Sequence, residues 1–342
     1  GVTNMAHMFY NARQFSQNIT SWEGSAASSL QRNIFYGAKS FTSQFICPFY
    51  FHSAPNSCKT REPVPHASFK TAVNSCLEEE PLKGDCTTYG TVTTKYGVMS
   101  EWDVSSVTDM QSAFSSKTTF NGDISNWDVR FVKDMSHMFY SANSFTQDLS
   151  SWQTSSLTRM YRIMYASYAN IDVSNWDVSN VRNMDRVFDN AYSFNKDISS
   201  WDVSGVTSMN YMFKSARIFN QDLNNWDTSS VTAMSEMFND ALEFDGKIGN
   251  WDISNIQNMW AFFHTAKKFN QDIGNWNTSN VTNMGGMFFD AFSFNQNIGS
   301  WSTAAVTNMN QMFDMATYFN NGGNSNINNW DTSSVTNMDG MF

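Results

Sequence analysis

Tryptophan recurs along this chain at a nearly constant interval, and that period restricts the fold more than any other feature. Most intervals are 25 residues, with one of 24 and one of 29, across Trp102, Trp127, Trp152, Trp176, Trp201, Trp226, Trp251, Trp276, Trp301 and Trp330. Trp22 begins an earlier copy, and Trp260 falls out of register. A fixed period of this length is typical of a repeat protein in which each unit buries its apolar face only against its neighbours.

Each copy of the repeat contains two local patterns. In the copy that begins at Trp201, apolar residues spaced by 3, 3, 1 and 3 predict a short helix; they are Val206, Met209, Met212, Phe213 and Ala216. Residues 222–227 predict a short strand that pairs with the same piece of adjacent copies. The sequence therefore predicts an α/β repeat with one short parallel strand and one short helix in each coil of about 25 residues.

The period breaks once, and the break divides the chain. Residues 1–45 carry the end of a first array, and residues 98–342 carry a second array of about ten coils, which we expect to continue past residue 342. Residues 46–65 hold three of the five prolines and indicate a terminus and a linker. In residues 66–97, an apolar stripe predicts a helix over 66–80; its members are Phe69, Ala72, Val73, Cys76 and Leu77.

All four cysteines lie in this break, at Cys47, Cys58, Cys76 and Cys86. An even number without a C-x-x-C motif favours two disulfides over a zinc site, and disulfides indicate an extracellular setting. Three pairings are open, and the turn at residues 83–86 favours Cys76 with Cys86, which leaves Cys47 for Cys58. Three sequons agree with an extracellular glycoprotein; they are Asn18, Asn277 and Asn280.

Aspartate recurs in two further rows, one directly after each tryptophan and one four residues before it. Stacked coils place these like charges about 5 Å apart. A calcium ladder would neutralise them, since carboxylates and amides are calcium ligands. The alternative is turn chemistry, in which aspartate accepts local backbone N–H bonds. Because the chain has no D-x-D-x-D-G calcium loop, we favour turn chemistry and predict no cofactor.

Composition and motifs exclude several function classes. Aromatic residues make up 15% of the 342, which is too many for a disordered chain, and the apolar runs are too short for a membrane span. The net charge of −10, without a basic cluster in the sequence, argues against nucleic acid and anionic lipid as partners. The five histidines are scattered, and hydrolase, zincin, P-loop and dinucleotide motifs are absent, so we predict no catalytic residue. Trp260 replaces a small polar residue of the repeat and is predicted to be a surface contact.

The recurring phrase V-T-N-M-x-x-M-F-x-x-A-x-x-F-N-Q-D-I-x-x-W-D-V-S-N closely resembles the DUF285 repeat, also called the bacterial surface protein 26-residue or BspA-like repeat. The resemblance covers residues 1–45 and 98–342 and implies a right-handed, leucine-rich-repeat-like solenoid at the cell surface. Residues 69–105 resemble the leader that opens such arrays. Residues 66–97, with Cys76 and Cys86, would then form a helical N-terminal cap of the second array. Met99, the shortened coil 152–175 and Lys247 depart from the pattern.

Two functions follow from these expectations. The first is an extracellular structural or adhesive protein of the cell surface, which would assemble with itself or with other surface proteins and glycans into a fibre or a coat. The alternative is a recognition module that binds a protein or a glycan on the strand face of the solenoid. Neither function requires a metal or a cofactor.

Overall fold

The computed structural model describes residues 45–46, 59–60, 62–84, 96 and 98–342. Packing divides the chain into two units, Gly1–Val107 with Gly122–Asp128, and Thr108–Asn121 with Val129–Phe342.

The first unit contains the helix expected over residues 66–80. Strands β1 (Phe45–Ile46) and β2 (Lys59–Thr60) pair antiparallel, and the 3₁₀ turns η3 (His66–Ser68) and η4 (Met99–Glu101) flank helix α2 (Phe69–Glu79). The five residues of the predicted apolar stripe are all buried. Ser68 occupies the N-cap position, but its side chain makes no capping hydrogen bond. The stripe packs on the repeat aromatics of this unit, since the ring of Phe69 meets that of Trp127 edge-on at 5.7 Å.

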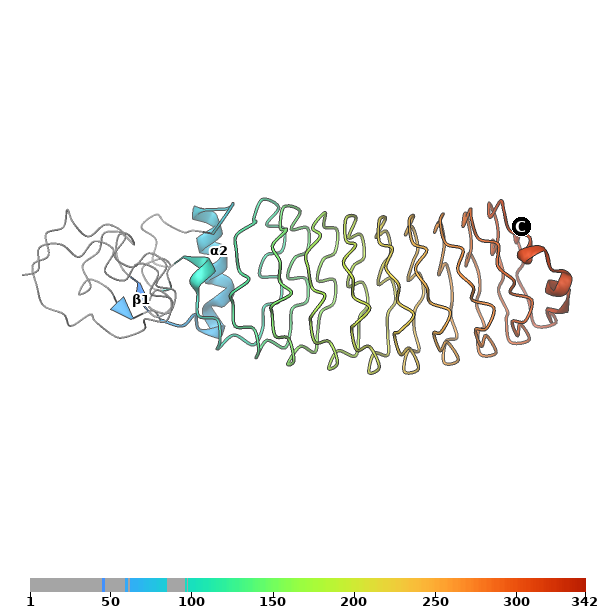
Figure 1. Cartoon of the computed structure of the whole chain (residues 1–342), viewed down its shortest axis with the longest axis horizontal. Coiled ribbons are helices and arrows are strands. Elements are labelled where there is room, and N and C mark those ends of the chain that lie inside the picture. Colours follow the sequence, from blue (N-terminus) through green and yellow to red (C-terminus); the bar gives the residue numbers. More distant parts are fainter. Residues whose placement is uncertain (1–44, 47–58, 61, 85–95, 97) are drawn as a thin grey trace, which may run out of the picture. The chain divides into compact units, whose positions relative to one another are not determined.

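The second unit is a stack of coils, and its coils are built from turns (Figure 1). Between residues 102 and 320, the structure contains no helix and no strand of two or more residues. Two 3₁₀ segments, η5 (Asn321–Gly323) and η6 (Ser325–Asn329), occupy the insertion of the 301–329 coil. The prediction of one short strand and one short helix in each coil, and with it the α/β solenoid, is therefore wrong.

The segment expected to be helical shows why. Within it, Met212, Lys214 and Ala216 donate backbone hydrogen bonds to the residue three before each. The alternating N–H groups leave the segment and donate to carbonyl oxygens of the next coil over 2.6–2.9 Å, from Met209, Tyr211, Phe213 and Ser215. Tyr211 and Ser215 adopt positive φ angles of 59° and 54°, which an α-helix does not allow. Consecutive turns with a left-handed residue thus repeat the i, i+3 spacing that a helix also has.

The predicted strand is wrong in place as well as in length. Residues 222–227 form no strand, and coils meet there through single bonds such as Leu223 N–H to the carbonyl of Lys247, 3.0 Å. Most isolated parallel bridges lie instead on the residue before the first methionine of each repeat, as between Ser208 and Ala233. One bridged residue per coil is too few for a strand.

The core explains the tryptophan period. In the coils that begin at Trp226 and Trp251, the two indoles are 3% exposed and stack with ring centroids 6.1 Å apart. The indole N–H of Trp226 donates to the carbonyl of Ile198 over 3.1 Å, and that of Trp251 donates to the carbonyl of Leu223 over 2.9 Å. A buried indole N–H needs such a partner. These tryptophans therefore tie the coils together in two ways, by packing on the next indole and by a directed hydrogen bond to a carbonyl 28 residues earlier in the chain.

A second column, which was not predicted from the sequence, runs along the residue that follows the last phenylalanine of the repeat and is most often asparagine. Asn220 donates its backbone N–H to the side-chain oxygen of Asn195 over 2.9 Å and accepts from the N–H of Asp245 over 2.8 Å. The same bond continues through Asn270, Asn295 and Asn320. The recurring Phe-Asn dipeptide was the signal that could have revealed this ladder.

Candidate functional site on the lateral face

One stretch of every coil sends side chains outward between buried Val, Met and Phe residues. In the coil that begins at Trp201 these are Thr207, Ser208, Asn210, Tyr211 and Lys214, all partly or largely exposed. Together with the residues at the same places in the other coils of the second unit they form what we call the lateral face. Its side chains differ from coil to coil, and several carry charge.

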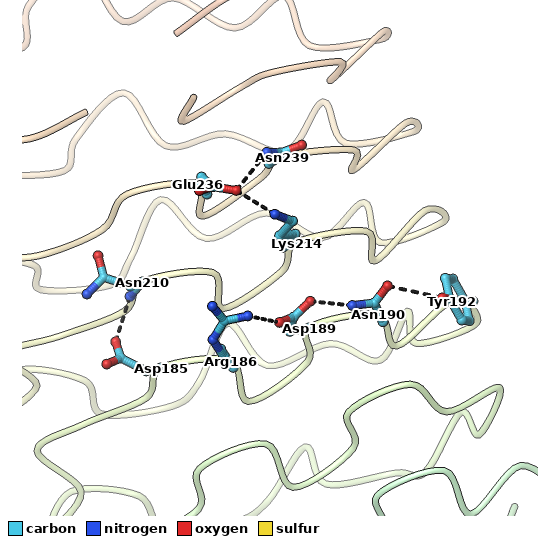
Figure 2. Close-up of polar contacts among 9 residues, drawn as sticks. All are labelled: Asp185, Arg186, Asp189, Asn190, Tyr192, Asn210, Lys214, Glu236 and Asn239. Atoms are coloured by element: carbon cyan, nitrogen blue, oxygen red, sulfur yellow. Dashed lines mark hydrogen bonds and ion pairs between the residues drawn. The ribbon is translucent and has the colours of Figure 1, made fainter. Parts of the chain in front are cut away.

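A buried ion pair lies at the centre of this face (Figure 2). Arg186 and Asp189 approach to 2.7 Å, and Asn190 donates its side-chain N–H to the other carboxylate oxygen of Asp189 over 2.6 Å. The hydroxyl of Tyr192 donates to Asn190 over 3.0 Å. Asp189 is fully buried, and burial raises the pKa of its carboxyl although the charge of Arg186 opposes this. A buried carboxylate such as that of Asp189 is stable in its charged form only while a cation, here Arg186, pairs with it.

A second set of polar contacts continues into the next coils (Figure 2). Lys214 pairs with Glu236 over 2.5 Å, and Asn239 donates to the same carboxylate oxygen over 2.9 Å. The ring of Tyr211 lies between the two cations, with the guanidinium of Arg186 3.8 Å and the ammonium of Lys214 5.4 Å from its centroid. Cation–π contacts of this kind hold both cations in defined positions.

Arg162 continues the set of cations on the other side. Its guanidinium lies 5.1 Å from the ring centroid of Tyr161 and 4.7 Å from that of Tyr165, and its buried Nε has no hydrogen-bond partner. Burial and, second, the charge of Arg162 lower the pKa of His137. The charges of Arg162, Arg186 and Lys214 all act on Asp189, so these cations converge although more than twenty residues separate each from the next. The sequence showed no basic cluster because the cations come together only when the coils stack.

The aspartate rows are engaged in their own turns, as the turn-chemistry interpretation predicts. Asp202 accepts from the backbone N–H and the hydroxyl of Ser204 over 3.1 and 2.6 Å, and Asp227 does the same with Ser229 over 3.0 and 2.6 Å. These hydrogen bonds lower the pKa of both carboxyls. Within the described part of the chain, His, Cys, Asp and Glu side chains form no group of three or more that could hold a metal ion.

The other predicted sites are scattered over the molecule. Trp260 is half-buried, because its ring lies over the next coil at Gly285, where a Cβ would come within 2.6 Å of Cζ3. Asn277 and Asn280 are exposed, and the side chain of Asn280 donates to the carbonyl of Ser254 over 2.7 Å. Cys76 is buried and disulfide-bonded. The remaining sites lie outside the described residues; they are Asn18, Cys47, Cys58 and Cys86.

Fold and face together define a tandem-repeat protein with a constant core and a variable polar surface. The chain belongs to the family described as Mycoplasma protein of unknown function, DUF285, whose pattern matches residues 1–49, 89–172, 164–259 and 243–342. No curated protein matches the chain. In the described ranges, none of the helices is long and apolar enough to cross a membrane.

Proposed function

We propose that the chain is an extracellular structural or adhesive protein of the cell surface, which acts by binding and not by catalysis. One observation carries this proposal: the coils share their main-chain bonds while the lateral face changes. The same left-handed position holds His137, Arg162, Arg186, Tyr211 and Glu236 in five successive coils. A constant interior with a variable outer face is how repeat proteins present extended binding surfaces.

The chemistry of the face supports binding over catalysis. The carboxylates that converge there are already committed, Asp189 to Arg186 and Asn190, and Glu236 to Lys214 and Asn239. A general base or nucleophile needs a free lone pair directed at a substrate. These groups instead hold cations and aromatic rings in place.

The surface location rests on two supports. The disulfide at Cys76 is typical of an oxidising compartment. The resemblance of the repeat to BspA-like surface proteins points the same way and favours tandem arrays that assemble into a fibre or a coat.

Two measurements test the proposal. An antibody against this chain should label intact cells of the source organism without permeabilisation. Beads coated with the folded chain should attach to those cells, while beads coated with the heat-unfolded chain serve as the control. Labelling only after permeabilisation, together with attachment no better than the control, would contradict the proposal.

A further inference from the structure

We propose that the lateral face binds an anionic polysaccharide, with cations of the 127–200 coils holding its acidic groups and an adjoining depression holding its hydroxyl-rich rings. This inference rests on the proposed function and names the class of ligand. Two neighbouring features of the face carry it. One is a row of exposed cations, and the other is a depression lined by amide-bearing and hydroxyl-bearing residues and one alanine.

The row of cations replaces the polar residues of the repeat in three successive coils. Lys133 and Arg182 stand where Thr207 and Thr232 stand in later coils, and Arg159 stands one residue further along. Lys133 and Arg159 are joined by the backbone bond from Arg159 N–H to the Lys133 carbonyl, 3.1 Å. Coils of such a stack lie about 5 Å apart, so the three cations form a short line along the stack.

These cations are largely available to a ligand. All three are exposed, and the side chain of Arg159 is 74% exposed in its pair with Asp134 at 3.3 Å. In the part of the chain that the structure describes, the ion pairs include neither Lys133 nor Arg182. Two further carboxylates are engaged in hydrogen bonds. Asp185 accepts from the hydroxyl of Ser208 over 2.6 Å and the N–H of Asn210 over 2.8 Å. Asp202, whose pKa the charge of Arg182 helps to lower, accepts from the N–H and the hydroxyl of Ser204.

Arg182 is held in position by its neighbours. One guanidinium nitrogen donates to the carbonyl of Ser179 over 2.8 Å. The guanidinium lies over Gly205 of the next coil, where a Cβ would come within 2.3 Å of Nη1. Ser230 and Asn255 stand at the same place in the following coils, so the glycine makes room for this arginine. A cation fixed in this way loses less conformational entropy when it binds an anion.

The depression lies further along the same face. Arg182 is linked to it through the threonine column, since its carbonyl accepts from Thr207 N–H, 2.9 Å, and the carbonyl of Thr207 accepts from Thr232 N–H, 2.9 Å. Ala233 stands where other coils carry asparagine, and its small side chain leaves space between the two coils. The depression is lined by Asn210, Thr232, Ala233, Ser235, Asn255, Gln257 and Asn258.

The combination selects a polysaccharide among anionic polymers. Amides and hydroxyls both donate and accept hydrogen bonds, which suits the hydroxyl groups of sugars. Single-stranded nucleic acid stacks its bases on exposed aromatic rings, and the lining of the depression contains no ring, although tyrosines accompany Arg162 and Arg186 elsewhere on the face. The overall charge of −10 also limits unspecific attraction of polyanions to other surfaces of the chain.

The test compares two variants with the same change of charge. The first carries Lys133→Gln, Arg159→Gln and Arg182→Gln. The matched control carries Lys247→Gln, Lys267→Gln and Lys268→Gln, whose cations lie outside the lateral face. Binding of the whole chain to dextran sulfate, polygalacturonate and neutral dextran is measured by interferometry, with duplex DNA and polyglutamate as competing classes. If the first variant has a lowered melting temperature, the double variant Lys133→Gln with Arg159→Gln replaces it. Its matched control is then Lys267→Gln with Lys268→Gln.

We expect the unaltered chain to bind dextran sulfate or polygalacturonate but not dextran, more weakly at high salt. The tighter of the two identifies sulfate or carboxylate as the acidic group. The face variant should bind about tenfold more weakly or worse, and the control within about twofold of the unaltered chain. Equal binding by both variants, or tighter binding of DNA or polyglutamate than of either polysaccharide, overturns the inference.

Two substitutions test the geometry without removing a cation. Asp134→Asn releases Arg159 and keeps the oxygen that accepts from Ser136 N–H over 2.8 Å, as Asn183 does at the same place in its coil, so binding should tighten. Gly205→Ser displaces the guanidinium of Arg182 and should weaken binding. If neither changes binding, the assigned row of cations is refuted.

Bead attachment separates this inference from the proposed function. If beads coated with the face variant attach as well as beads coated with the unaltered chain, the proposed adhesive function is retained and the polysaccharide inference is contradicted. Unaltered beads that do not attach contradict adhesion, while the purified polymers still decide the inference.

Discussion

Replacing Arg186 with alanine would leave the carboxylate of Asp189 buried without its cation. Arg186 lies 2.7 Å from this carboxylate, and Asp189 is fully buried. Removing one member of a buried pair costs about 3–5 kcal/mol, and the contact with the ring of Tyr211 adds about 0.5–2 kcal/mol. The matched control is Lys267→Ala, whose partner Asp290 is 3.4 Å away and whose side chain is 51% exposed, so its loss should cost no more than about 1 kcal/mol.

The assay is native-state hydrogen exchange, because coils of a repeat protein open locally and a single unfolding free energy is not well defined. Backbone N–H groups that bridge to the next coil, such as that of Phe213, should lose protection in the Arg186→Ala variant far more than in the control. Burial holds the pKa of Asp189 above its ordinary value, so its contribution to stability is present at pH below that value and is lost as the pH rises through the folded pKa. Without Arg186 this loss grows, and the variant should recover stability toward acid pH. A cost equal to that of Lys267→Ala, or a cost independent of pH, would refute the reasoning.

Three further predictions concern the repeat itself. Asn220→Ala should lower the stability of its coil by about 0.5–1.5 kcal/mol because it removes one step of the amide ladder, whereas Asn220→Asp keeps the acceptor oxygen and should cost less by thermal melting. Gly286→Ala should cost about 1 kcal/mol for its φ of 60° alone, and Gly246→Ala should cost more, because its Cβ would lie 2.0 Å from a backbone oxygen; the reverse order of melting temperatures would contradict the geometry. The hydrogen bonds from Ser204 lower the pKa of Asp202, so they stabilise the fold at pH above the ordinary carboxyl pKa, and this stabilisation is lost as the pH falls through the pKa of the folded state. Ser204→Ala should therefore reduce the fall of the melting temperature toward acid pH.

Helix α2 and the turns of the aspartate rows could be predicted because their causes are local. The stripe from Phe69 to Leu77 marks one face of a helix, and Asp202 finds its donors two residues away in Ser204. The helix expected at Val206–Ala216 failed because a spacing of three residues also fits successive turns with left-handed residues. Whether an N–H group bonds within its segment or to a carbonyl about 24 residues away cannot be read from that spacing.

The same limit applied to the candidate site. Trp260 stood out as an irregular residue, but its half-buried position depends on Gly285 in the following coil. Arg162, Arg186 and Lys214 did not stand out, because each repeat carries only two or three cations. Their charges act together on Asp189 only because the coils stack about 5 Å apart.

By itself, the sequence determined the period, the apolar core and the tryptophan column. An apolar side chain that recurs at the same place in every repeat is expected to be buried, whatever path the backbone takes between the repeats. It also determined that aspartate would serve turns, since the acceptor and its donors lie within two residues of each other. Only the tertiary structure decided that each coil is made of turns and that Asp189 is buried. It also decided that cations gather on one face. These features depend on hydrogen bonds and charge interactions between coils, which bring together residues that are about 25 positions apart in the sequence.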